Sequence, residues 1–284
     1  MIKSIQIAYD EFFEKKCRIA SAAGFRNIAL NFHGMKDRSP QAWEKAPDEI
    51  RRILSENNLT GVQSHLPWYD LRISSEILDE EIEDAIRNSI KVCGAVGIPW
   101  CVAHPRSSIT SGFRASQSLK ENQTVISGYL DLAAACGTGI GLENLPEFPD
   151  IVPQMLFYTC NYEDLCILHD SFRTDNVCIC WDTGHANLMH FNQADAIRFI
   201  GSRIGCTHIH NNFTHNDDHL PIDNGNIKWD EVIRAFCDIC YIGPFTLETH
   251  CLYPEDNMLK AFAEYNFAGL CYLEKLSENY EKQT

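Results

Sequence analysis

The feature that most constrains this chain is a regular alternation of short apolar runs with longer amphipathic stretches. Eight runs have the length and apolar character of buried strands. They are Ile5–Ala8, Asn27–Asn31, Gly61–His65, Trp100–His104, Gly139–Glu143, Val177–Trp181, Cys206–His210 and Phe245–Glu248. Helical patterns lie between and after them, at about residues 10–23, 40–57, 77–96, 115–136, 162–170, 192–202, 229–240 and 256–276.

Eight strand–helix units predict an α/β fold, a (β/α)8 barrel of the TIM type formed as a single domain by residues 1–284. Alternating order implies parallel strands, and parallel strands need helices to cover their outer face. The competing fold is a doubly wound open sheet, which normally carries a glycine-rich turn between an early strand and a helix. The one candidate turn, Gly137 to Gly141, precedes a strand instead, so the barrel is favoured.

Composition excludes several functional classes. Twenty-four Lys and Arg against 39 Asp and Glu give a net charge of −15, with no basic stripe, so we expect no nucleic-acid partner. No apolar run of about 18 residues is present, and residues 1–6 lack the apolar region of a signal peptide, so we expect a soluble, cytoplasmic protein. The 13 cysteines are odd in number and lie mostly in apolar runs, which predicts reduced thiols.

Metal-ligand side chains follow six of the predicted strands. In a parallel barrel the functional site is built from the carboxyl ends of the strands and the loops that follow. These ends and loops carry His65, His104, Glu143, Asp182, His185, His208, His210 and Glu248. Buried carboxylates need a partner of opposite charge. A divalent cation neutralises several of them at once, so the pattern predicts a metal site.

The individual residues differ in how strongly they indicate a ligand. A lone histidine after a strand, such as His65 or His104, is more often a hydrogen-bonded core or loop residue. Glu143 and Glu248 directly follow apolar runs, where a solvated glutamate would be out of place. We expect no special role for four other histidines, which are His33, His169, His190 and His250.

These motifs resemble the xylose-isomerase-like barrel superfamily, which includes sugar phosphate isomerases and epimerases, inosose dehydratases and the AP endonuclease family 2, the endonuclease IV type. The resemblance runs from about residue 5 to 272. It is carried by Gly141-Leu142-Glu143-Asn144, Trp181-Asp182-Thr183-Gly184-His185-Ala186, His208-Ile209-His210, the loop from Asp218-His219-Leu220-Pro221 to Ile227-Lys228-Trp229, and Phe245-Thr246-Leu247-Glu248. These motifs are specific to the superfamily and not to one substrate.

The resemblance implies one divalent ion held by four residues, Glu143, Asp182, His210 and Glu248. It also implies that His208 supports the site from the lumen and that His185 contacts substrate or a second metal. Two departures leave the substrate open. Residues 223–225 read Asp-Asn-Gly where the family commonly has Gly-Glu-Gly, and Asn31 stands where many relatives carry a glutamate.

Two glutamates on one metal predict a metal-dependent sugar or sugar phosphate isomerase or epimerase. A hydroxy-ketone would chelate the ion, and the ion would stabilise an enediolate when the α-proton leaves. Glu143 or Glu248 would remove the proton and the other would return it from the opposite face, with His185 as a further catalytic candidate. Mn²⁺, Mg²⁺ or Co²⁺ suits such a carboxylate-rich site, and additional histidines favour Zn²⁺. Arg106 is the one cation expected near the mouth.

Three alternatives stay open at this point. The first is a dehydratase acting on an inosose or keto-sugar, and the second is a non-catalytic sugar-binding barrel. The third is an endonuclease IV-type zinc phosphodiesterase, against which the absence of basic DNA-binding loops argues. Its metal set would be His65, His104, Glu143, Asp182, His185, His210, Asp217, His219 and Glu248. This surplus of ligands predicts more than one zinc when zinc is abundant; a homo-oligomer is neither indicated nor excluded.

Overall fold

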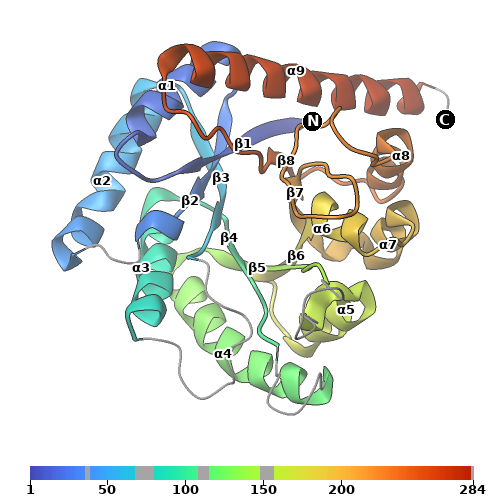
Figure 1. Ribbon diagram of the computed structural model, residues 1–284. Coiled ribbons are helices and arrows are strands. Elements are labelled where there is room, and N and C mark those ends of the chain that lie inside the picture. The colour runs from blue at the N-terminus through green and yellow to red at the C-terminus, as the bar shows by residue number, and fades with distance from the viewer. Residues whose placement is uncertain (36–38, 68–79, 108–114, 148–156, 283–284) are drawn as a thin grey trace.

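The computed structural model is described for residues 1–35, 39–67, 80–107, 115–147 and 157–282. Eight parallel strands close into a barrel in chain order, and the last strand pairs with the first. Helices surround the strands on the outside (Figure 1). The predicted (β/α)8 TIM barrel is therefore confirmed.

The strands are β1 (Ile2–Ala8), β2 (Asn27–Asn31), β3 (Thr60–His65), β4 (Trp100–Ala103), β5 (Gly139–Glu143), β6 (Val177–Asp182), β7 (Ile204–Ile209) and β8 (Pro244–Leu247). The helices are α1 (Phe13–Ala23), α2 (Pro40–Glu56), α3 (Glu80–Val96), α4 (Ala115–Cys136), α5 (Tyr162–Ser171), α6 (Thr183–Leu188), α7 (Gln193–Ile200), α8 (Trp229–Asp238) and α9 (Asp256–Glu281). Three short 3₁₀ turns complete the described elements, η1 (His33–Met35), η2 (Tyr158–Cys160) and η3 (Gly201–Arg203).

Two differences from the predicted boundaries have clear physical causes. β1 begins three residues earlier than its apolar run because Ile2 pairs with Pro244 of β8, and this pairing helps to close the barrel. The short helix α6 was not predicted. It forms because the carboxylate of Asp182 caps its first turn and accepts a hydrogen bond from the backbone N–H of His185.

Alternation along the strands creates two separate cores. One side of each strand packs against the helices and contributes to a continuous apolar layer, for example Ile28 and Leu30 of β2. The other side faces the lumen, where a small buried cluster consists of Val102, Cys178, Cys180 and Cys206 with Trp100 packed against it. Val102, Cys180 and Cys206 each stand two positions before a residue that the sequence places at the site. These site residues are His104, Asp182 and His208.

Helix α9 closes the outer ring. It packs against α1 and α8, and in Figure 1 it runs along the upper outer edge of the barrel, above the N-terminus. Lys3 of β1 donates a hydrogen bond to the carboxylate of Glu274, which ties the first strand to the last helix. No helix within the described residues is long and apolar enough to cross a membrane. None of the 13 cysteines forms a disulfide, including Cys237 and Cys240 of the one Cys-x-x-Cys motif.

The close approach of β4 and β5 gives a stability prediction. A Cβ on Gly139 would lie 2.4 Å from the Trp100 ring and 2.8 Å from the backbone oxygen of Asn176. We expect Gly139→Ala to destabilise the fold by about 1–3 kcal/mol through overpacking. Gly128→Ala is the matched control, because its Cβ would meet only the Arg87 guanidinium at 3.7 Å inside α4. Alanine is favoured over glycine there by about 0.5–1 kcal/mol. The urea concentration at the midpoint of unfolding should fall for Gly139→Ala and rise for Gly128→Ala. Equal midpoints for the two variants would contradict this packing.

Candidate metal centre

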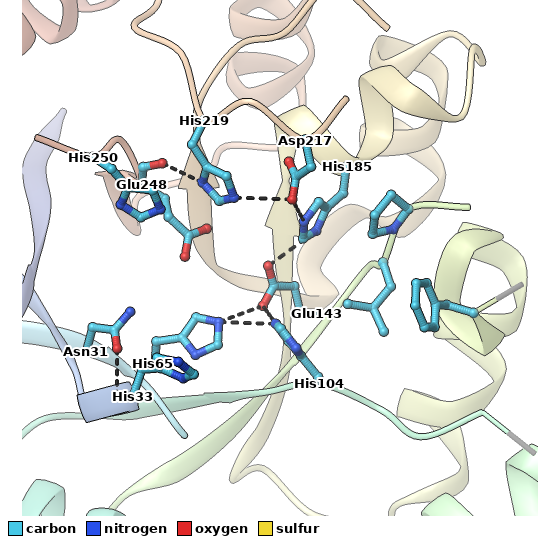
Figure 2. A pocket seen from close by; sticks show the side chains of 13 residues that line it. Asn31, His33, His65, His104, Glu143, His185, Asp217, His219, Glu248 and His250 are labelled. Atoms are coloured by element: carbon cyan, nitrogen blue, oxygen red, sulfur yellow. Dashed lines mark hydrogen bonds and ion pairs between the residues drawn. The ribbon is translucent and has the colours of Figure 1, made fainter. Parts of the chain in front are cut away.

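The carboxyl ends of the strands surround a cavity of about 400 Å³ (Figure 2). Imidazoles and carboxylates dominate its polar lining, and a short apolar wall stands beside them. The lining residues are Asn31, His33, His65, His104, Glu143, Leu145, Pro146, Phe157, His185, Asp217, His219, Glu248 and His250. Seven of the nine residues predicted as metal or substrate contacts therefore line one cavity, and Asp182 and His210 lie buried beside it.

Local structure holds the deepest residues in place. Asp182 is the last residue of β6, and its main chain is clamped by the side chain of Asn144, which donates to the Asp182 oxygen at 2.9 Å and accepts from its N–H at 2.7 Å. Gly184 follows in α6, where a Cβ would lie 1.8 Å from Cε1 of His210. The glycine therefore lets the His210 ring approach this helix.

Glu143, Asp182, His208 and Glu248 form a central group whose ligand atoms all lie within 4.8 Å of one another. Nδ1 of His208 lies 2.9 Å from one oxygen of Glu143 and 3.1 Å from one oxygen of Glu248. All four side chains are buried, with Glu248 the most accessible at 5% exposed. Glu143 and Glu248 thus share His208 as a partner, and Oδ2 of Asp182 lies 3.9 Å from the same nitrogen.

The charges in this group depend strongly on one another. Burial lowers the pKa of His208, but Glu248 and Glu143 outweigh it and raise that pKa to about 10. Burial raises the pKa of Glu248, but His208 and His219 outweigh it and lower that pKa to about 2. Burial also opposes ionisation of Glu143, yet His208 and His104 hold its pKa well below the ordinary value. Both glutamates are therefore ionised at neutral pH.

A second group combines His65, His104 and Glu143. Nδ1 of His65 lies 2.7 Å from the backbone oxygen of Leu66. Because a carbonyl can only accept, that nitrogen carries the ring proton. Nε2 of His65 then faces Nε2 of His104 at 3.1 Å and Oε2 of Glu143 at 3.6 Å, while His104 Nε2 lies 3.0 Å from the same oxygen. Burial lowers the pKa of His65, but Glu143 outweighs it and raises that pKa above the ordinary value, so this carboxylate favours a proton or a metal ion on Nε2.

A third group repeats this pattern with His185, His210, Asp217 and His219. Nδ1 of His185 donates to the backbone oxygen of Asn144, and Nδ1 of His219 donates to that of Glu248, each at 2.8 Å. Their Nε2 atoms lie 3.1 and 3.2 Å from the same Oδ2 of Asp217. Anchoring one ring nitrogen on a carbonyl while the other turns to a shared centre is typical of metal-binding histidines.

Electrostatics in the third group also favour a cation. Burial opposes the charge on His219, but Asp217 and Glu248 raise its pKa to about 9. Burial opposes ionisation of Asp217, yet His185 and His219 hold its pKa far below the ordinary range. Without a metal, protons on the imidazoles supply the positive charge. The donor set in all three groups therefore fits divalent cations, because a metal can replace these protons on the same atoms.

One detail of the expected ligand set differs from the geometry. The four-residue set implied by the resemblance contains His210, with His208 as support. In the structure His208 belongs to the compact central group, and His210 belongs to the third group. His210 keeps contact with the central carboxylates, because its Nε2 lies 3.0 Å from Oδ2 of Asp182.

His33 and His250 line the cavity, although the sequence led us to expect no special role for either, and His250 stacks on the His219 ring at 4.7 Å between centroids. Asn31, which stands where many relatives carry a glutamate, lines the cavity as well. His250 lies two positions after Glu248, so the alternation rule could have found it. Arg106, which was expected near the mouth, is not among the lining residues, and the side chain of Asn122 bonds its main chain on both sides.

Comparison with known proteins places this barrel in context. The uncharacterised protein MJ1311 of Methanocaldococcus jannaschii is 30% identical over 195 residues, which are 65% of this chain and 62% of that protein. A D-psicose 3-epimerase of Enterocloster bolteae is 30% identical over 116 residues, 41% of this chain and 35% of the enzyme. The chain thus matches less than two thirds of the length of either relative.

Solved structures show the same fold. A D-tagatose 3-epimerase-like protein superimposes with a TM-score of 0.75 over 100% of this chain and 99% of its own, at 20% identity. The family model for the xylose isomerase-like TIM barrel matches residues 17–268, which include every residue of the three metal-ligand groups. The chain therefore belongs to the xylose isomerase-like TIM barrel family.

Proposed function

We propose that this protein is a divalent-metal-dependent sugar isomerase or epimerase that works by proton transfer between carbon atoms and two glutamates. One observation carries the proposal. Glu143 and Glu248 are both ionised, both line the cavity, and their oxygens lie 2.9 and 3.1 Å from the same His208 nitrogen. Two carboxylate bases of this kind are suited to remove a proton and to return one.

The cavity suits an uncharged sugar. Among the described residues no lysine or arginine lines it, so the lining lacks the two side chains that most often bind phosphate groups in proteins. Its volume of about 400 Å³ lies within the range of small-ligand sites. Asn31 and His33 offer hydrogen-bonding groups to the cavity, and Leu145 and Phe157 add apolar surface to its lining.

The two glutamates divide the proton transfer. One takes the proton from the carbon next to the carbonyl, and the electron pair moves into the carbonyl. The other glutamate is ionised at rest, so it first takes a proton from water in the cavity; it then gives that proton to the opposite face of the carbon, which inverts it, and the first glutamate releases its proton to water. If the first glutamate instead returns its proton to the neighbouring carbon, aldose and ketose exchange. A bound divalent cation would supply Lewis-acid polarisation of the carbonyl oxygen. Glu143, Asp182, Glu248 and a histidine, His210 or His208, would hold it.

The names of similar proteins support the same class. One similar protein is named a D-psicose 3-epimerase, and one similar structure is named a D-tagatose 3-epimerase-like protein. Proton-exchange NMR with a panel of ketoses in deuterated water tests the proposal. Exchange at C3 would indicate 3-epimerisation, exchange at C1 or C2 would indicate isomerisation, and loss of water from a keto-sugar would support the dehydratase instead. No exchange with any ketose in the metal-loaded protein would count against the proposal.

The second candidate function is zinc-dependent phosphodiester hydrolysis of the endonuclease IV type. The specific observation in its favour is the pair of additional groups, which bring His65 and His104 to Glu143, and His185 and His219 to Asp217. Several imidazole-rich sites in one cavity favour zinc with an open coordination position. The net charge of −15 opposes DNA binding, so we rank this function below the sugar reaction.

The proposed base is tested by Glu248→Gln. The amide keeps the shape of the side chain but cannot take a proton, so we expect turnover to fall by about 10²–10⁴-fold. Glu264→Gln on the exposed side of α9 removes a carboxylate of the same size and should leave turnover unchanged. Rates are compared at equal metal occupancy, measured by elemental analysis. Near-normal turnover by the loaded Glu248→Gln protein would exclude Glu248 as an acid or base.

The third group is tested by metal stoichiometry. After zinc loading and desalting we expect more than one zinc per chain, with release of protons near pH 7.5 because the His219 pKa of about 9 keeps that ring protonated until metal displaces the proton. Asp217→Asn should lower the ratio by about one. Asp223→Asn in the same loop, where the carboxylate faces Tyr265, should not change it. A ratio near one in the unaltered protein would reject the multinuclear site.

The ranking of the two functions is tested on DNA. We expect no efficient cleavage of a duplex with one abasic site at low salt with added zinc, because acidic residues outnumber basic ones by 39 to 24. Gel electrophoresis of the end-labelled duplex gives the measurement, and Glu143→Gln protein reports contaminating nuclease. Incision at the abasic site that Glu143→Gln abolishes would reverse the ranking.

A further inference from the structure

A line of amide side chains crosses from β2 to the metal-ligand groups. The backbone N–H of His33 donates to Oδ1 of Asn31 at 2.8 Å, and Nδ2 of Asn31 donates to Oε1 of Gln6 at 2.9 Å. Nε2 of Gln6 then donates to Oε1 of Glu248 at 2.8 Å. The four partners come from η1, from the end of β2, from β1 and from the residue that follows β8.

The direction of this line is fixed by chemistry. A backbone N–H can only donate, so the Asn31 atom that faces it must be oxygen and the other end must be the NH₂ group. Gln6 must then present its oxygen to Asn31 and its NH₂ group to Glu248. The main chain of the η1 turn thereby determines that Glu248 receives a donor and never an acceptor.

The strand register places these side chains. Gln6 lies on the lumen side of β1, because Ile5 and Ile7 on either side of it belong to the outer core. Asn31 ends β2 and is paired with Ala8, two residues beyond Gln6. A lumen residue on each strand can therefore reach the next one around the barrel.

Glu248 is held from four directions as a result. Its N–H donates to the backbone oxygen of Ile209 at 3.1 Å, and its own backbone oxygen accepts from His219 at 2.8 Å. Gln6 holds Oε1, and His208 lies 3.1 Å from Oε2. With Oε1 occupied by the amide, Oε2 is the oxygen directed toward the central group.

We propose that Gln6 and Asn31 are positioning residues, which hold the Glu248 carboxylate through a one-way amide relay so that Oε2 is presented to the metal. The relay uses neutral donors, so it orients the carboxylate without neutralising it. This inference rests on the proposed role of Glu248 as a ligand and base. Outer partners of metal ligands typically change metal affinity or activity by about 10–100-fold when they are removed.

The test is a double-mutant cycle measured by Mn²⁺ titration in the absence of any sugar. Gln6→Met removes both relay bonds of Gln6, and Asn31→Leu removes the support behind it at nearly constant volume. We expect Gln6→Met to raise the Mn²⁺ Kd by about 10-fold or more and Asn31→Leu to raise it less. The double variant should bind no more weakly than Gln6→Met alone, because both changes interrupt one line.

The matched control is Asn27→Leu, the same substitution four residues earlier on β2, where the amide donates to the backbone oxygen of Lys3 at 3.2 Å. It should leave the Mn²⁺ Kd unchanged. Urea unfolding of the metal-free variants separates loss of folding from loss of affinity, and Asn31→Leu alone still tests the relay if Gln6→Met does not fold. Unchanged Kd in both single variants, or effects that multiply in the double variant, would overturn the proposal.

The outcomes also separate this inference from the proposed function. If Mn²⁺ affinity follows the expected cycle but no ketose exchanges its protons, the relay stands and the sugar reaction fails. If ketoses are turned over by the unaltered protein and the variants bind Mn²⁺ normally, the sugar reaction stands and the relay fails.

Discussion

Buried negative charge is the constraint on which the rest of this structure depends. Glu143, Asp182 and Glu248 are at most 5% exposed and lie within a few ångströms of one another, with Asp217 close beside them. Such a group can persist only if positive charge is supplied on the same atoms. The imidazoles do this by holding protons or by yielding their lone pairs to a cation. Their ring orientations, with Nδ1 on a backbone carbonyl in three cases, suit both states.

The barrel satisfies this constraint through simple geometry. Each strand sends alternate residues into the lumen, so a single register delivers a small apolar residue below and a ligand above. Cys180 precedes Asp182 in this way, and Cys206 precedes His208. The main chain then adds precision at two points, the Asn144 clamp on Asp182 and the closeness of Gly184 to His210. The Asn144 contacts involve only the main chain of Asp182, yet they fix where its carboxylate lies, and Gly184 leaves room for the His210 ring.

Much of this arrangement could be predicted from local patterns, because strand alternation and parallel order require no knowledge of long-range contacts. Glu143 and Glu248 were identifiable since each directly follows an apolar run. The alternation rule could not decide between His208 and His210, because residues two apart fall on the same side of a strand and only contacts with distant residues assign them to different groups. The role of Gln6 could not be predicted from the sequence for another reason. A polar residue in an amphipathic strand has an ordinary solvent-facing explanation, and its link to Glu248 spans 242 residues.

The cluster of Trp100, Val102 and three cysteines beneath the ligands determines how molecules enter and leave the cavity. Its side chains fill the lumen below the ligands, so the cavity is closed at its base. A substrate and its product must pass the same rim, which His33 and His250 occupy. A hydrogen held on Glu143 or Glu248 between its removal and its return can exchange with water that enters the cavity over this rim.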